Sequence, residues 1–318
     1  MESYEYFHLH PDFCCWNDLS EIFKRRIRDL ILFLMFSSIY VGIACASMVY
    51  ISSFIQDVAG NPVAMIMMFL VCFSVYNLNR KTDEAEDAIN REDRYSFTKK
   101  YEKPLYFSAV LGSGMALLLA SLYGLSTFLL ILTPFIAGVL YSIPFLPPNS
   151  GYRRLKEIPL VKNVVVTIAW AVPLTFLPLA VVHAPVTPAT GITLVFFLSW
   201  AFIASTLPDI RDKEGDEQAG IRTIPVVIGI ERTLNLLTRI NVILGICAVI
   251  LSIIYLSPVI TLLIILSCIY TQLVIHSFSR THKKGITFDF LNDGQFFIIG
   301  IIVYSISILI SSLAIIPL

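Results

Sequence analysis

Nine long runs of apolar residues divide this 318-residue chain and restrict the folds that are open to it. An α-helix needs about 20 apolar residues to cross the hydrocarbon core of a bilayer. Because lipid offers no hydrogen-bond partners to a backbone, such runs cross as helices. The composition agrees, since only 14% of the residues are charged, against about 25% in soluble domains. We expect spans at 30–54, 61–78, 104–122, 125–144, 161–183, 190–207, 234–255, 258–277 and 295–316.

The charges lie on one side of this predicted membrane protein. If the N-terminus is inside, all 23 Lys and Arg residues fall before the first span, in the loops after the second, fourth, sixth and eighth spans, or within about two turns of those loops. Of the 23 acids, only Asp57 lies outside. Positive charge resists translocation, so the pattern predicts a cytoplasmic N-terminus and a multi-pass protein of the cell membrane. Residues 1–29 are interpreted as a cytoplasmic tail and 30–318 as one nine-helix transmembrane domain.

Two acidic stretches follow even-numbered spans and therefore lie on the same predicted membrane face. The first, YNLNRKTDEAEDAIN (76–90), places Asn79, Asp83 and Asp87 four residues apart, which aligns them along one side of a helix. The second, LPDIRDKEGDEQAGIRTIP (207–225), places three acids within a similar sector if the helix continues: Asp209, Asp212 and Asp216. Asp83 and Asp212 are 129 residues apart in the sequence, and so are Asp87 and Asp216, which indicates an internal repeat.

The chemistry of these side chains points to a hard cation. Carboxylates with one amide oxygen, and with no His or Cys nearby, suit Mg²⁺ or Ca²⁺ rather than zinc or copper. Mg²⁺ binds through one or two carboxylates and completes its shell with water and substrate phosphates. Two such stretches facing one cavity would bind a diphosphate. The alternative is that each stretch is a solvated helix end, the usual role of a charge run.

On these motifs the chain resembles the UbiA superfamily of intramembrane prenyltransferases (4-hydroxybenzoate polyprenyltransferase-like). The family's Asn-x-x-x-Asp-x-x-x-Asp motif is matched by Asn79, Asp83 and Asp87, and its Asp-x-x-Asp-x-x-x-Asp motif by Asp209, Asp212 and Asp216. Many members carry Asp after the first Asn, whereas this chain has Arg80. The resemblance implies nine helices around a central cavity, with Mg²⁺ as the cofactor.

The loop after the fourth predicted span, LYSIPFLPPNSGYRRLKEIPLVKN (140–163), lies on the same face. Its basic residues Arg153 and Arg154 are explained by the topology alone. In the family a Tyr at the end of the fourth helix and a Lys after this loop face the diphosphate, and Tyr141 and Lys156 match them. An ammonium there would stabilise the charge that develops on the leaving group.

The function implied by the resemblance is Mg²⁺-dependent transfer of a prenyl group from a prenyl diphosphate to an aromatic or other lipophilic acceptor within the membrane. Family acceptors include quinone precursors, glycerol phosphate lipids, haem and polyenes, and no residue selects one. Membrane lipids are expected partners and nucleic acid is not. Two other classes stay open: a transporter, whose acids should lie mid-span, and a non-catalytic membrane protein. The last inner loop holds Asp289 and Asp293 before the ninth span; it could cover the cavity or be a solvated connection, and we interpret it as a solvated connection outside the site.

Overall fold

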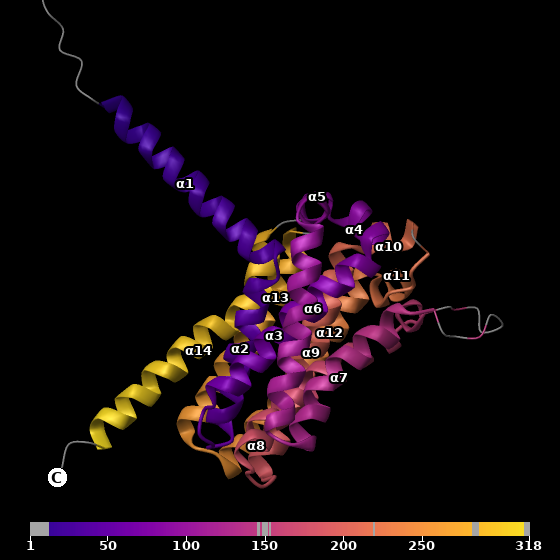
Figure 1. Cartoon of the computed structure of the whole chain (residues 1–318). Coiled ribbons are helices and arrows are strands. Elements are labelled where there is room, and N and C mark those ends of the chain that lie inside the picture. The colour runs from indigo at the N-terminus through magenta and orange to yellow at the C-terminus, as the bar shows by residue number, and fades with distance from the viewer. Residues whose placement is uncertain are drawn as a thin grey trace, which may run out of the picture.

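The computed structural model describes residues 13–144, 147, 152, 154–218, 220–281 and 286–314 (Figure 1). Every regular element in these ranges is a helix, so the predicted all-α class is confirmed. The elements are α1 (Phe13–Phe36), α2 (Ile39–Ile55), α3 (Pro62–Thr82), α4 (Glu84–Asn90), α5 (Glu92–Lys100), α6 (Glu102–Leu122), α7 (Leu125–Ser142), the 3₁₀ turn η2 (Leu155–Glu157), α8 (Val161–Val182), α9 (Pro188–Arg211), α10 (Lys213–Gln218), α11 (Ile224–Ile228), α12 (Ile230–Tyr255), α13 (Pro258–Thr281) and α14 (Ile286–Ala314).

Seven helices of the described chain are long and apolar enough to cross a membrane. They are α3, α6, α8, α9, α12, α13 and α14, and an eighth crossing results if the bent pair α1–α2 counts as one span. The apolar part of α7, Leu125–Leu140, is shorter. Eight of the nine predicted spans thus each fall on one helix and the first falls on the bent pair α1–α2, while the predicted number of nine crossings stays a prediction.

The first predicted span is not one straight helix. α1 and α2 meet at an angle of 67°, and Ser38 between them adopts a left-handed conformation with φ 66°. The break frees two backbone carbonyls, and α3 supplies donors for both. Asn77 Nδ2 donates to Ser37 O at 3.0 Å, and the Arg80 guanidinium donates to Phe36 O. Tertiary contacts therefore stabilise a break that hydropathy does not reveal.

The long helices pack in a closed order. α2 packs against α3, α3 against α7, α7 against α8, α8 against α9, α9 against α12, α12 against α13 and α13 against α14, and α14 returns to pack against α2. α6 packs outside this ring, against α3 and α7. α1 extends away from the other helices, whereas α4, α5, α10 and α11 cluster at one end of them (Figure 1).

The outside of the bundle is apolar, as the predicted membrane location requires. Large side chains such as Leu122 and Leu125 are 74% and 72% exposed. The interior contains other large apolar side chains, among them Met48, Phe197 and Phe296, that are almost completely buried. A protein surrounded by water rarely exposes so large an apolar surface.

α3 is capped at its N-terminus and is long enough to cross a membrane. Asn61 precedes the helix and its side-chain oxygen accepts from the N–H groups of Val63 at 2.8 Å and Ala64 at 3.3 Å. Pro62 at the first helical position lacks the N–H that would go unused there. The 21 residues of α3 then span about 30 Å, which matches the hydrocarbon core. The first acidic stretch consequently begins near the opposite end of this helix from Asn61.

Candidate functional site

A cavity of about 370 Å³ is lined by residues from both acidic stretches. All six predicted ligand residues take part in the lining: Asn79, Asp83, Asp87, Asp209, Asp212 and Asp216. The same cavity is bordered by residues of α2, α7, α8 and α14. Stretches that lie far apart in the sequence therefore face one space, as the sequence predicts. Their role as metal ligands stays a prediction.

Each acidic stretch lies across a joint between two helices, not on one continuous helix. Asp83 separates α3 from α4 with φ −105° and ψ 17°, and Asp212 separates α9 from α10 with φ −91° and ψ 4°. The helical hydrogen bonds nevertheless continue, since Asp87 N–H donates to Asp83 O and Asp216 N–H to Asp212 O, both at 2.9 Å. The two stretches thus share one backbone design, which supports the internal repeat.

The short helices that follow the two joints, α4 and α10, contact each other directly. Asn90, the last residue of α4, donates from Nδ2 to Asp216 Oδ1 on α10 at 3.2 Å. Gly215 makes this approach possible, because a Cβ at that position would lie 1.8 Å from Asn90 Oδ1. The absence of a side chain at Gly215 therefore lets the first stretch bind the second.

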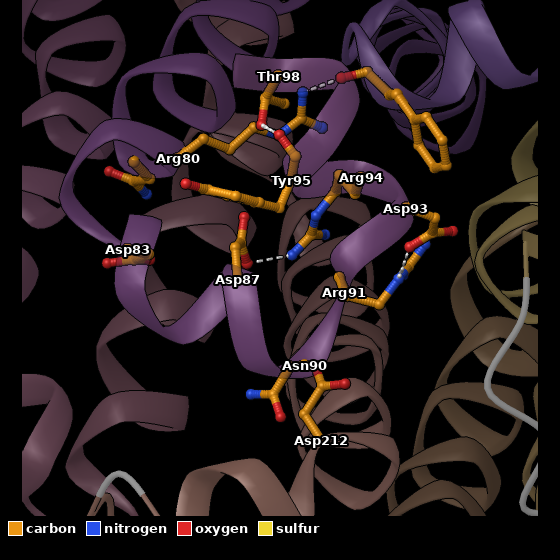
Figure 2. Close-up of polar contacts among 12 residues, drawn as sticks. Arg80, Asp83, Asp87, Asn90, Arg91, Asp93, Arg94, Tyr95, Thr98 and Asp212 are labelled. Carbon is orange, nitrogen blue, oxygen red and sulfur yellow. Dashed lines mark hydrogen bonds and ion pairs between the residues drawn. The ribbon is translucent and has the colours of Figure 1, made fainter. Parts of the chain in front are cut away.

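Cations hold two of the cavity carboxylates in place. Arg94 on α5 contacts Asp87 Oδ1 at 2.5 Å (Figure 2). Lys162 at the start of α8 contacts Asp209 Oδ1 at 2.5 Å, and Asn163 donates to Asp209 Oδ2 at 3.1 Å. Side chains fixed in this way are preorganised for a ligand, since their rotamers are set before it arrives.

Arg211 connects the second stretch to the last helix. Its guanidinium grips Asp212 through two hydrogen bonds, at 2.7 and 2.8 Å, and reaches Asp289 Oδ1 on α14 at 2.5 Å. Arg91, which follows the first stretch, contacts Asp289 Oδ2 at 2.7 Å. Both arginines are almost fully buried, with 3% and 4% of their side chains exposed. One carboxylate on α14 thus joins the loops of both acidic stretches.

The interpretation of Asp289 and Asp293 as a solvated connection was wrong. Both residues line the cavity, together with Asn292 between them. The reason is that α14 begins at Ile286, earlier than the predicted ninth span, so the acids belong to its first two turns. The polar side chains of Asp289, Asn292 and Asp293 lowered the apparent hydropathy of the first two turns and hid the start of the helix.

Arg80 stands where many family members have Asp, and it faces the cavity without joining the acids. Its guanidinium donates to Phe36 O and, at 3.3 Å, to Asn77 Oδ1. Arg80 therefore stabilises the α1–α2 break. The motif residues Asn79, Asp83 and Asp87 still line the cavity.

The carboxylates of the second stretch are oxygen donors of the kind that a hard divalent cation takes. Within the described ranges no three His, Cys, Asp or Glu side chains come close enough together to hold a metal ion by themselves. A Mg²⁺ ion in this cavity would have to take its other ligands from phosphate and water. Burial raises the pKa of Asp216 to about 6, and Asp209 and Asp212 add to the rise against the opposing charge of Lys162. A bound cation would favour the ionised carboxylate.

Aromatic side chains form the apolar part of the cavity wall. Tyr76 and Trp170 stack with their ring centroids 6.0 Å apart, and Trp200 and Tyr40 border the same space. Aromatic faces attract positive charge. The cavity thus combines an acidic end with an aromatic wall.

Two predicted site residues cannot be placed in this cavity. Tyr141 is in the last turn of α7 and Lys156 in η2, but their side chains lie outside the part of the structure that is described.

Sequence reasoning missed most of the cations at the cavity. Arg94 lies seven residues after Asp87, but the helix is broken at Arg91 between α4 and α5, so the spacing alone does not predict their contact. Lys162 and Arg211 gave no signal either, because basic residues near the inner end of a span are expected from topology alone. Their role depends on which carboxylates the fold brings to them.

Two relatives share part of the chain. A Digeranylgeranylglyceryl phosphate synthase from Pyrococcus horikoshii is 27% identical over 181 residues, which cover 52% of this chain and 57% of the relative. A protein of the same name from Thermococcus sibiricus is 28% identical over 191 residues, which cover 59% of this chain and 62% of the relative. The chain therefore matches about three fifths of the length of these relatives.

Solved structures share the fold over most of the chain. A UbiA homolog from Archaeoglobus fulgidus bound to GPP and Mg²⁺ superposes with a TM-score of 0.63 at 17% identity, covering 86% of this chain and 99% of that one. An apo UbiA homolog from Aeropyrum pernix K1 gives 0.60 at 17% identity, covering 83% and 98%. The UbiA prenyltransferase family model itself matches residues 33–309. With its apolar helices, this multi-pass membrane protein belongs to the UbiA prenyltransferase family.

Proposed function

We propose that this protein transfers a prenyl group from a prenyl diphosphate to a lipophilic acceptor in the membrane, with Mg²⁺ as the cofactor. The observation that carries the proposal is the meeting of the two acidic stretches at one cavity. Solvated helix ends would have no reason to be joined across 126 residues by the Asn90–Asp216 hydrogen bond. Family membership and the GPP and Mg²⁺ bound to a protein of the same fold support the same chemistry.

The residues of the acidic end have separate tasks in this reaction. Asn79, Asp83 and Asp87 on one side, and Asp209, Asp212 and Asp216 on the other, would hold Mg²⁺. Bound Mg²⁺ neutralises the diphosphate as the allylic C–O bond breaks. Arg94 and Lys162 border the same cavity, and we expect them to bind diphosphate oxygens through charge-assisted hydrogen bonds.

The aromatic wall would shield the reacting carbon. Positive charge develops on the allylic group as the diphosphate leaves, and the faces of Tyr76 and Trp170 can stabilise it. Exclusion of water from the bundle prevents hydrolysis of this reactive species. The isoprenoid tail would extend among apolar side chains of the same cavity, which accounts for an enzyme placed within the membrane.

Two assignments rest on the family pattern. We propose that Lys156 and Tyr141 act at the diphosphate, where an ammonium and a phenol would stabilise the leaving group. For the acceptor we propose a glyceryl phosphate lipid, because both matching relatives are named for the synthesis of one.

We propose a nine-crossing arrangement with the acidic end in the cytoplasm. The one-sided distribution of the Lys and Arg residues supports the orientation. The closed packing order of the long helices supports a single bundle. The apolar α7 and the bent pair α1–α2 would supply the two crossings beyond the seven helices that are long enough by themselves. In this arrangement the cavity is central and opens toward the cytoplasm.

The orientation can be tested by cysteine labelling. In a variant without the six native cysteines, a cysteine at Glu84 or Glu214 should react only with reagents that cross the membrane, because both positions lie at the cytoplasmic end. A cysteine at Val186, which is 70% exposed in the α8–α9 connection at the other end, serves as the matched control and should react with an impermeant reagent. Labelling of Glu84→Cys from outside would overturn the topology.

Product analysis tests the function itself. The purified full chain is incubated with geranyl or geranylgeranyl diphosphate, Mg²⁺, and a panel of acceptors that includes a glyceryl phosphate with one geranylgeranyl ether and an aromatic acid. We expect mass spectrometry to show one prenylated acceptor, formed only with Mg²⁺ and lost on chelation. A protein that neither binds the diphosphate nor prenylates any acceptor would contradict the proposal, and so would full transfer in the presence of a chelator.

A further inference from the structure

Asp293 is a carboxylate of the cavity wall that does not belong to the proposed Mg²⁺ ligands. It lies on the cavity side of α14 and is only partly accessible. Among the described residues it forms no ion pair, and the hydrogen bond it accepts comes from its neighbour, Asn292 Nδ2, at 3.3 Å. Asp289, one turn earlier, is held by two arginines. An acid inside a membrane span without a cation is costly and marks a functional site.

The helix segment that carries Asp293 is held firmly. Tyr40 on α2 donates its hydroxyl to Phe290 O at 2.9 Å, and Tyr270 on α13 donates to Leu291 O at 2.8 Å. Gly294 eases the approach of Tyr40, since a Cβ there would lie 3.1 Å from the Tyr40 hydroxyl, whereas the Tyr270 hydroxyl would be at an ordinary contact distance of 3.8 Å. These tyrosines lock α14 through its backbone and leave the Asp293 carboxylate free to meet a ligand.

The position of Asp293 relative to the acidic end can be followed through contacts. Asp212 is bound by Arg211, and Arg211 reaches Asp289 at 2.5 Å. Asp293 lies four residues further along α14, which is about 6 Å deeper and on the same helical face. It therefore borders the cavity one turn below the proposed diphosphate site, at the depth where the carbon next to the diphosphate would lie.

A substrate must complete the surroundings of this carboxylate. A carboxylate with so little access to water needs hydrogen-bond donors or a cation, and the described part of the chain provides one amide. The prenyl tail is a hydrocarbon and offers no donor, so the missing donor belongs to the acceptor. We propose that Asp293, oriented by Asn292, binds the hydroxyl of the acceptor and takes up its proton during transfer, so that the acceptor is an alcohol prenylated on oxygen. This assignment rests on the proposed prenyl transfer and adds the residue that binds the acceptor and takes up its proton.

The step balances without a further reagent. The acceptor oxygen forms a bond to the allylic carbon, and the bond from that carbon to the diphosphate oxygen breaks with its electron pair going to diphosphate. The hydroxyl proton passes to the Asp293 carboxylate and from there to solvent or product. No oxidation or reduction takes place.

The test separates the acceptor from the donor. In Asp293→Asn the shape and the bond to Asn292 are kept, but the side chain can no longer take up a proton. General-base catalysis contributes about 10²- to 10⁴-fold, so we expect kcat for transfer to the monoprenylated glyceryl phosphate to fall at least about 100-fold. Binding of geranylgeranyl diphosphate with Mg²⁺, measured by titration calorimetry, should be unchanged. Asp293→Glu should restore part of the rate, and Glu231→Gln, an exposed acid on α12, should change nothing.

Each contrary outcome has its own meaning. Normal transfer in Asp293→Asn overturns this inference and leaves prenyl transfer intact, whereas a wild-type protein that neither binds the donor nor transfers overturns the proposed function itself. Loss of donor binding in Asp293→Asn would place the residue at the diphosphate and also overturn the inference. If that variant does not fold, the wild type decides: an acceptor whose hydroxyl is replaced by a methyl ether should compete at least about 10-fold more weakly than the alcohol, and equal competition, or a product joined through carbon, contradicts it.

Discussion

Replacing either Asp83 or Asp212 with asparagine should reduce prenyl transfer by about 100-fold or more. Each change keeps the size of the side chain but removes a negative charge from a proposed Mg²⁺ ligand, and even outer contacts of a metal ligand are worth 10- to 100-fold. If the two acids grip one diphosphate through metal ions, the double variant should be barely slower than either single one, because residues that act as a unit are strongly non-additive. Steady-state rates at saturating donor give the comparison.

Asp93→Asn is the matched control for this experiment. Asp93 belongs to the same acidic end and pairs with Arg91 at 3.3 Å, but its side chain is 51% exposed and takes no part in the cavity lining. It should retain near-normal transfer. If Asp83→Asn and Asp212→Asn were as active as this control, both stretches would be ordinary solvated helix ends, and the metal site would be wrong.

Asp289→Asn should cause the largest loss of stability among single changes at the cavity, about 3 kcal/mol. The carboxylate stands between Arg91 and Arg211, whose side chains are 4% and 3% exposed. Without it, two buried guanidinium groups approach each other with no shared counter-charge, and removing one partner from a buried ion pair is strongly destabilising. A lower unfolding temperature in detergent, with donor binding weakened in parallel, is the expected result.

Glu102→Gln provides the comparison at the surface. Glu102 also bridges two cations, Lys81 and Lys99, but these lysines are 50% and 48% exposed. Because water and salt screen exposed pairs, the unfolding temperature should hardly change. Equal effects of the two substitutions would show that the Asp289 bridge is no more important than a surface ion pair.

Hydropathy predicted the helices well because burial in lipid acts on each run of residues separately. The acidic stretches were also predictable, since their spacing is a local property of the sequence. The break before Ser38 was not, because neither Pro nor Gly marks it and the donors that stabilise it, Asn77 and Arg80, come from another helix. A property that depends on a distant partner has no local signature.

The same reasoning explains which parts of the site escaped prediction. Asp289 and Asp293 looked like loop residues because acidic side chains are unusual in a membrane helix. In the structure Asp289 pairs with two buried arginines and both acids line the cavity. Arg211 looked like a topological charge until its contacts to Asp212 and Asp289 were known. For such residues the amino-acid type gives the charge, and only the packing of α4, α10 and α14 gives its partner.

The contact between Gly215 and Asn90 also limits how this sequence can change over evolutionary time. Gly215 has an ordinary helical backbone, so its need for glycine comes from its neighbour, whose Oδ1 would lie 1.8 Å from a new Cβ. A larger residue at 215 would therefore require the Asn90 side chain to move aside or position 90 to become smaller, and either change removes the hydrogen bond to Asp216. The two positions, 125 apart in the chain, are thus coupled, and a change at one of them weakens the contact between the two acidic stretches.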